Sequence, residues 1–270
     1  MQKVKSITSF CLLILAGMYV VLCTACKKPE VEHKEIKSVI NTAHLDHLYE
    51  EITMGEDTVG IVHIYAEAPD YHFVDDADEG FACVDDASRA AIFYLLEFQR
   101  TEVVEFLRKG RLLMKFILAM QAENGYYYNF IWPDGTINKE GITSKPEPNF
   151  WAWRSLWAMG VARNIMSPND PIYNAILLQQ NRLIRNILQE KKFRSETIDT
   201  AMRFDVATWL PKVSGTDQAS IVLVGLTLAH VHEKDVAFKD SITDFIHHFA
   251  DGIMMMQVNS PGNMEDGAFL

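Results

Sequence analysis

Three segments of the chain are apolar on nearly every side of a helix. They cover residues 86–98, 151–165 and 218–230. Each is followed by a segment with apolar positions on one helical face and charged residues on the other, and these cover residues 102–121, 171–189 and 236–257. A helix that is apolar all round is buried on more than one side, whereas a two-faced helix lies between a core and water. The pattern predicts three helical hairpins.

The hairpins form an internal repeat. Their apolar helices are expected to begin near residues 86, 150 and 217, which are 64 and 67 residues apart. The commonest helical repeats are shorter, at about 34 to 47 residues, and the extra length here lies in the links between hairpins. One fully buried and one half-buried helix in each unit suit two concentric layers, so the predicted fold class is all-α. An α-solenoid and an irregular helical bundle are the alternatives.

The segment before the first hairpin is harder to interpret. Residues 32–54 have helical spacing and predict an entry helix, while residues 58–66 are rich in valine and isoleucine and also fit a short strand. Residues 27–34 are interpreted as a tether. The helical domain is expected to cover residues 35–270.

The N-terminus has the pattern of a targeting segment. Lys3 and Lys5 precede an apolar run over residues 10–23, which is short for a membrane span. Small residues then lead to Cys26, as in a bacterial lipoprotein cleavage box, so residues 1–26 are expected to be a lipoprotein signal with Cys26 as the lipidated residue. Lys27 after it favours the outer membrane of a bacterial envelope. An ordinary signal peptide or an anchor helix is the alternative.

The charge and the cysteine content exclude some partners and cross-links. The net charge is −11, and no cluster of basic residues is present, so nucleic acid is not an expected partner. If Cys26 begins the mature chain, Cys83 is the one free thiol that is left and no internal disulfide can form. No pattern calls for a cofactor, and the oligomeric state is left open.

The stretch EGFACVDDASRA joins an acidic loop to the first apolar helix. Asp85 and Asp86 stand at the helix start with Arg89 one turn further on. Aspartate caps helices well, acid suits the first turn, and Arg89 can pair with either aspartate. A capped and charge-paired helix start therefore accounts for these residues without any further role.

The links between hairpins are aromatic. Residues 125–138 read GYYYNFIWPDGTIN, with a strong turn signal at Pro133–Gly135 between two β-prone runs. Residues 144–153 read SKPEPNFWAW and hold Glu147 just before the second apolar helix. The aromatic side chains could present flat faces to a ligand or pack in the core.

The CVDDASRA start, the Asn-Gly-aromatic link and the Trp-rich FWAWRSLWAMG helix together resemble the six-hairpin (α/α) toroid carbohydrate-active enzymes over residues 80–270. The resemblance implies a ring whose inner-helix starts share one funnel, and cleavage or, less often, epimerisation of a glycan. Three hairpins are counted instead of six. The acidic-then-apolar run at residues 265–270 looks like an interruption, so the toroid is expected to be incomplete.

Within that resemblance, paired carboxylates would supply the acid and base chemistry of glycoside hydrolysis. Neighbours at a helix start point in different directions, so a third carboxylate is expected to join them. The catalytic candidates are Asp85, Asp86 and Glu147. The candidate residues for binding an oligo- or polysaccharide are Arg89, Tyr127, Trp132, Trp151 and Trp153.

Other chemistries fit less well. Arg89 stands where a DDxxD motif needs its last aspartate, and residues 75–80 lack the spacing of a calcium loop. The pairs His230/His232 and His247/His248 fit surface or boundary positions better than metal ligation. The sequence therefore predicts a glycan-degrading, glycoside hydrolase-like enzyme held on the envelope by a lipid. The alternative is a non-catalytic glycan-binding helical lipoprotein or an inactive fragment of such an enzyme.

Overall fold

The computed structural model describes residues 40–201, 204–211 and 215–257. By its internal contacts the chain divides into two units, Met1–Asn41 and Thr42–Leu270, and every helix and strand that is described belongs to the second. The expected signal segment, Cys26 and the tether lie outside the described residues. No helix in the described part has the length and apolar character needed to cross a membrane.

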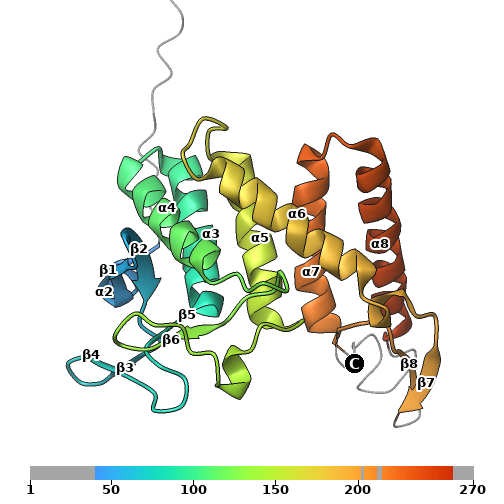
Figure 1. Ribbon diagram of the computed structural model, residues 1–270, viewed down its shortest axis with the longest axis horizontal. Coiled ribbons are helices and arrows are strands. Elements are labelled where there is room, and N and C mark those ends of the chain that lie inside the picture. The colour runs from blue at the N-terminus through green and yellow to red at the C-terminus, as the bar shows by residue number, and fades with distance from the viewer. Residues whose placement is uncertain (1–39, 202–203, 212–214, 258–270) are drawn as a thin grey trace, which may run out of the picture. The chain divides into compact units, whose positions relative to one another are not determined.

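Six long helices form three hairpins within the residues that the structure describes. They are α3 (Val84–Thr101), α4 (Val104–Ala119), α5 (Phe150–Ile165), α6 (Tyr173–Gln189), α7 (Thr216–His232) and α8 (Val236–Met255). Helix α5 contacts both α3 and α7, and each of α4, α6 and α8 packs on the helix before it. Figure 1 shows the hairpins side by side. The predicted helix starts near 86, 150 and 217 are confirmed to within two residues.

The middle helix packs closely on its neighbour. A Cβ at Gly225 of α7 would lie 2.6 Å from Leu156 Cγ, and a Cβ at Gly160 of α5 would lie 2.7 Å from Leu228 Cβ. Each glycine therefore lets a leucine of the other helix pack directly against its backbone, and a larger residue at either position would clash with that leucine. Leu156 and Ile92 are buried as predicted, but Leu223 is half-buried and Val224 is 40% exposed. Helix α7 is thus apolar on a face that the described residues do not cover.

Strands accompany the helices, so the all-α prediction is only roughly right. Four antiparallel pairs are present in the described part of the chain: β1 (Tyr49–Met54) with β2 (Asp57–Val62), β3 (Tyr65–Glu67) with β4 (His72–Val74), β5 (Ala82–Cys83) with β6 (Phe130–Ile131), and β7 (Ile198–Ala201) with β8 (Phe204–Ala207). The first pair packs on α4 through β2, where Val59 and Ile61 are buried.

The predicted entry helix is wrong over much of its described part. Only Ala43–Leu48 is helical (α2), and the next six residues form β1. Gly55 takes the left-handed conformation at φ +65° in the tight turn that follows, and β1 then pairs along its whole length with β2. Cross-strand pairing outweighs the helical spacing of this segment.

Candidate functional site

The three inner helices begin at the same end of the array. In Figure 1 the starts of α3, α5 and α7 all lie at the lower end, together with the β3–β4 and β5–β6 pairs. The short connections within hairpins lie at the opposite end. The long links, which carry the aromatic and acidic residues, therefore gather around the helix starts, as the sequence predicts.

The start of α3 is capped by Cys83, and the two aspartates lie in its first turn. The Asp86 backbone N–H donates to Cys83 Sγ at 3.4 Å, and the thiol donates back to Asp86 Oδ2 at 3.3 Å. Burial, followed by the nearby Asp86 carboxylate, raises the pKa of the Cys83 thiol well above its usual value. Because the cap is supplied by sulfur, Asp85 and Asp86 are not needed as N-caps.

Two arginines fix the two carboxylates. Arg89 Nη2 is 3.2 Å from Asp85 Oδ2 and also pairs with Asp86 Oδ1. Arg154, from α5, pairs with the same Asp85 Oδ2, and its guanidinium lies over the Phe150 ring at 4.9 Å. Asp85 Oδ1 is buried and has no hydrogen-bond partner among the described residues.

Arg154 is a residue of the site that sequence analysis missed. The available signal was a single charged side chain inside the apolar run FWAWRSLWAMG. It is 20% exposed, its partner Asp85 is 17% exposed, and the pair joins the first two inner helices. A charge inside an apolar helix requires a partner, but its position 69 residues away could not be read from the sequence.

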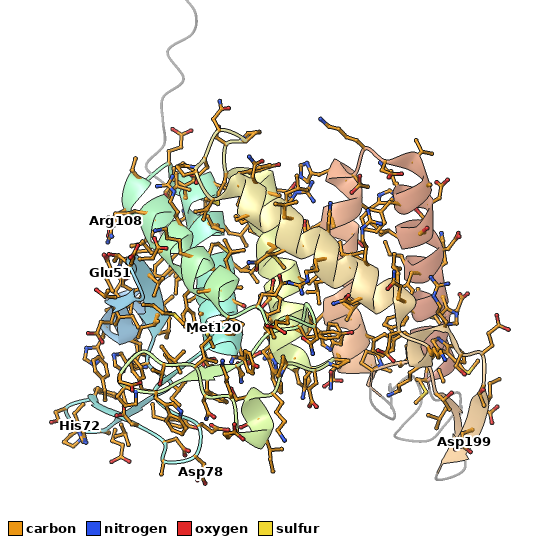
Figure 2. All side chains as sticks on the ribbon, in the orientation of Figure 1. Glu51, His72, Asp78, Arg108, Met120 and Asp199 are labelled. Carbon is orange, nitrogen blue, oxygen red and sulfur yellow. The ribbon has the colours of Figure 1, made fainter. Side chains whose placement is uncertain are left out.

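An acidic and aromatic cleft of about 790 Å³ lies between the acidic loop and the aromatic link, and its lining does not include Asp85 or Asp86. Its rings are Tyr65 and Trp132, and its carboxylates are Asp76, Asp78, Glu79 and Glu140. Figure 2 shows Asp78 at the end of the molecule where the inner helices begin. Of the aromatic residues proposed to bind substrate, Trp132 is the one that lines this cleft. Aromatic side chains together with polar groups that fix orientation are typical of small-molecule binding sites.

Asn138 holds the walls of the cleft together. Its side-chain amide donates to the carbonyls of Asp78 and Glu79 at 3.0 Å each, and its side-chain oxygen accepts from the backbone N–H groups of Glu140 and Gly141. Asn138 is 1% exposed, so these four bonds are shielded from water. The acidic loop and the link 137–144 are therefore fixed to each other.

The acidic loop also packs against the aromatic link. A Cβ at Gly80, which has φ +119°, would lie 2.1 Å from the carbonyl oxygen of Ile131. Only glycine permits this approach, and the β5–β6 pair continues it at Ala82 and Cys83. The predicted turn at Pro133–Gly135 is present, since Gly135 N–H donates to the Trp132 carbonyl at 2.8 Å.

Tyr65 lines the cleft, and its phenol is close enough to Asp86 at the start of α3 to be influenced by that carboxylate. Partial burial raises its pKa, and the carboxylates of Glu79, Asp76 and Asp86 add to this shift. The phenol is therefore protonated at neutral pH and can donate a hydrogen bond to a ligand.

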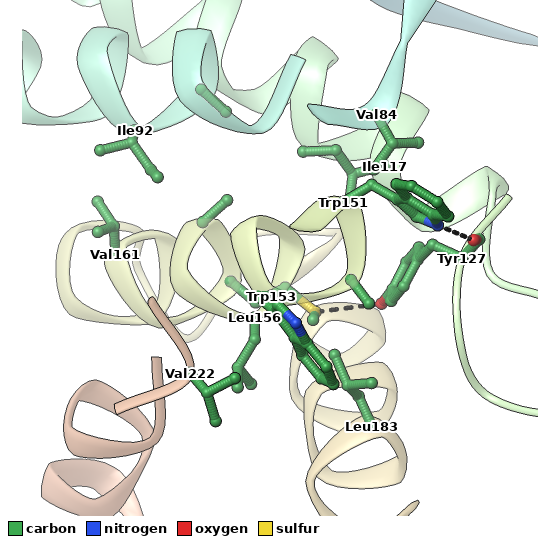
Figure 3. Packing of buried hydrophobic residues seen from close by; sticks show 14 of the residues in the cluster. Val84, Ile92, Ile117, Tyr127, Trp151, Trp153, Leu156, Val161, Leu183 and Val222 are labelled. Atoms are coloured by element: carbon green, nitrogen blue, oxygen red, sulfur yellow. Dashed lines mark hydrogen bonds between the residues drawn. The ribbon is translucent and has the colours of Figure 1, made fainter. Parts of the chain in front are cut away.

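Three of the predicted binding residues belong to the core. Tyr127 and Trp153 are fully buried and Trp151 is 6% exposed. Trp151 Nε1 donates to the Tyr127 carbonyl at 2.7 Å and Trp153 Nε1 donates to Gln218 Oε1 at 2.8 Å. Figure 3 shows these rings between α5 and the neighbouring helices. A ring enclosed in this way has no face free for a sugar, so packing accounts for all three.

Glu147 lies apart from the aspartates. Its carboxylate accepts from the side chain of Asn149 at 3.2 Å and lines a separate hollow with Glu190 and Phe193. No contact joins Glu147 to Asp85 or Asp86 among the residues that are described. Its proposed role as their partner stays a prediction.

A second, largely apolar hollow of about 330 Å³ touches Asp86 and Arg89 from the side of β2. His63 lies on its wall, with Nε2 at 2.7 Å from Glu50 Oε2 and its ring stacked on Phe73 at 3.7 Å between centroids. Sequence analysis did not single out His63, because the pairing of β1 with β2 brings Glu50 to it. The described residues contain no group of three or more His, Cys, Asp or Glu side chains that could hold a metal ion.

No family model matches the chain, and no curated protein matches it. One similar solved structure is described as a glycosyl hydrolase family 88 protein from Bacteroides vulgatus, with a TM-score of 0.45 and 10% sequence identity. The alignment covers 68% of this chain and 50% of that one, so the chain spans about half the length of the solved protein. A likeness of this size does not assign the chain to that family.

Proposed function

We propose that the chain is a glycan-binding protein that degrades its glycan, in the manner of a glycoside hydrolase, at the end where the inner helices begin. One observation carries the proposal: a cleft lined by Trp132, Tyr65 and four carboxylates is formed by the acidic loop and the aromatic link, and the link pairs with β5 directly before the start of α3. Asp85 and Asp86, which arginines fix, lie in the first turn of that helix. Trp132 and Tyr65 would pack on sugar rings, and the carboxylates would accept bonds from hydroxyl groups.

The chemistry assigns different roles to the carboxylates. Glycoside hydrolysis uses one carboxylic acid that protonates the leaving oxygen and one carboxylate that acts as base or nucleophile. Asp85 and Asp86 are held in ion pairs, which suits a base, a nucleophile or a ligand for the sugar better than a proton donor. The proton donor would then be an acid outside these pairs. It would be either Glu147, the third carboxylate of the sequence prediction, or Glu79, whose Oε1 accepts from the Thr143 hydroxyl at 2.8 Å.

A non-catalytic glycan-binding protein is the second candidate. It is favoured by the same ion pairs, since both aspartates already have partners, and by the separate position of Glu147. In that case Asp85 and Arg154 would join α3 to α5 and the cleft alone would bind the glycan.

The test replaces Asp85 and Asp86 singly by asparagine and measures the release of reducing sugar from a panel of glycans. Loss of a catalytic carboxylate typically lowers turnover on the order of 100-fold or more. Asp57→Asn is the matched control, because Asp57 is exposed and pairs only with Lys115 among the described residues. Unchanged turnover in both variants would exclude catalysis by these residues, and binding without any turnover in the wild type would favour the second candidate.

We also propose that the mature chain is tethered to the bacterial envelope, in its outer membrane, by a lipid on Cys26. The cleavage-box pattern of the sequence supports this. Labelling of cells with a radioactive fatty acid should tag the wild type and not Cys26→Ala, and equal labelling of the two would overturn the proposal.

A further inference from the structure

We infer that the acidic and aromatic cleft selects glycans that carry free amino groups, such as those containing unacetylated hexosamine. The inference rests on the proposed function in so far as the ligand is a glycan. The observation behind it is the charge of the cleft, which the ligand itself would balance.

The cleft is lined by four carboxylates and by no basic side chain. Asp76, Asp78, Glu79 and Glu140 form no ion pair with a lysine, arginine or histidine among the described residues. The neighbouring helix start differs, since Asp85 and Asp86 are matched there by Arg89 and Arg154. The protein thus balances its charge at the helix start and leaves it unbalanced in the cleft.

Two of these carboxylates are free to bind a ligand. Asp76 Oδ1 accepts from the backbone N–H groups of Asp78 and Glu79, so it shapes the loop, and Glu79 accepts from Thr143. The side chains of Asp78 and Glu140 are exposed and have no partner in the described part of the chain. An ammonium group with three donors could bond to either of them.

The rings of the cleft suit the same ligand. A sugar with an ammonium substituent offers an apolar ring face and a cation, and Trp132 and Tyr65 can bind both, by stacking and by cation–π attraction. A glycan that carries carboxylate or sulfate groups would instead meet four like charges within one cleft, which disfavours binding.

The test compares three oligosaccharides of equal length by isothermal titration calorimetry with the full chain. They are a glucosamine oligomer, at a pH where its amines are protonated, its fully N-acetylated counterpart and an oligogalacturonate. We expect the glucosamine oligomer to bind at least tenfold more tightly than the N-acetylated one and the oligogalacturonate not to bind. The difference should shrink in 1 M salt, where the screening length falls to about 3 Å.

Two double variants locate the effect. Asp78→Asn with Glu140→Gln should weaken binding of the glucosamine oligomer about tenfold, as expected for two exposed ion pairs, and leave the N-acetylated oligomer unaffected. Glu56→Gln with Asp240→Asn removes the same charge from exposed positions outside the cleft and should change neither affinity. Circular dichroism and the Tm would establish that both variants are folded.

The outcomes separate the inference from the proposed function. Equal affinity for both hexosamine oligomers, with Trp132→Ala abolishing both, would overturn the inference and leave glycan binding intact. No binding of any glycan would overturn both. Binding of a lysine oligomer as tightly as the glucosamine oligomer would also overturn the inference, because the cleft would then recognise cationic peptides.

Discussion

Replacing Arg154 by methionine removes the guanidinium group that joins α5 to Asp85 at the start of α3. Methionine keeps an apolar stem of similar length, so the change is chiefly electrostatic. Exposed ion pairs contribute about 0.2–1 kcal/mol, and breaking a fully buried pair costs about 3–5 kcal/mol. Asp85 and Arg154 are 17% and 20% exposed, so their pair lies between these limits. We expect Arg154→Met to lower the free energy of unfolding by about 1–2 kcal/mol.

A double-mutant cycle isolates the pair from the other contacts of Arg154. Its contact with the Phe150 ring is lost in Arg154→Met whether or not Asp85 is present, so this loss cancels in the cycle. The variants are Arg154→Met, Asp85→Asn and the two combined, followed by urea unfolding. We expect a coupling of about 1 kcal/mol, and a decrease of Tm by about 2–4 °C for each kcal/mol lost.

The matched control is Arg108 with Glu105, an exposed pair on α4 at 2.7 Å. The cycle Arg108→Met with Glu105→Gln should give a coupling of at most about 0.5 kcal/mol, as for other helix-surface pairs. If the Arg154–Asp85 cycle gives no more than this control, the pair does not join the two helices and the reasoning is wrong.

Three further predictions concern packing and titration. Gly225→Ala should lower the free energy of unfolding by about 1–3 kcal/mol, measured by urea unfolding, and Leu156→Ala in the same chain should recover part of the loss. Cys83 should resist a thiol reagent at pH 8 in the native chain and react once the chain is unfolded; reaction at the same rate in both states would contradict its buried, high-pKa thiol. Burial raises the pKa of Asp46, but hydrogen bonds from Lys109 and other partners outweigh it and lower the pKa below 3.8. Because a lowered carboxyl pKa stabilises the fold above that pH, Asp46→Asn should lower the Tm at neutral pH and lose this effect as the pH falls below about 3.8.

The helical hairpins could be predicted because their cause is local. Helices α3 and α5 are apolar all round and each outer helix is apolar on one face, so the sequence itself indicates which surfaces are buried. The strands could not be predicted in the same way, since β1 has helical spacing and becomes a strand by pairing with β2. Helix α7 shows the opposite limit: its apolar character predicts burial, yet Val224 is exposed. The apolar pattern shows which face of a helix tends to be buried, and the neighbouring elements determine whether that face is covered.

For the candidate site, the sequence identified the segments better than the side chains. The aromatic link and the acidic loop do come together beside Asp85 and Asp86. Which rings face outward depends on the exact direction of each side chain, so Trp132 lines the cleft while Trp151 and Trp153 are in the core. Arg154 and Asn138 make contacts about 60 to 70 residues away along the chain, which no local pattern records.

The pairing of β5 with β6 has a consequence for how the cleft assembles during folding. Ala82 and Cys83 pair with Ile131 and Phe130, so the whole of the first hairpin lies inside the loop that this short pair closes. Contacts between residues so far apart form slowly, because the entropy of the intervening chain must be lost first. The hairpin of α3 and α4 can shorten that search by bringing both ends of the loop to the same end of the array. Because the hairpin forms first and the β5–β6 pair closes only afterwards, the walls of the cleft would be among the last parts of this region to form. They would also be among the first to separate when the chain opens locally.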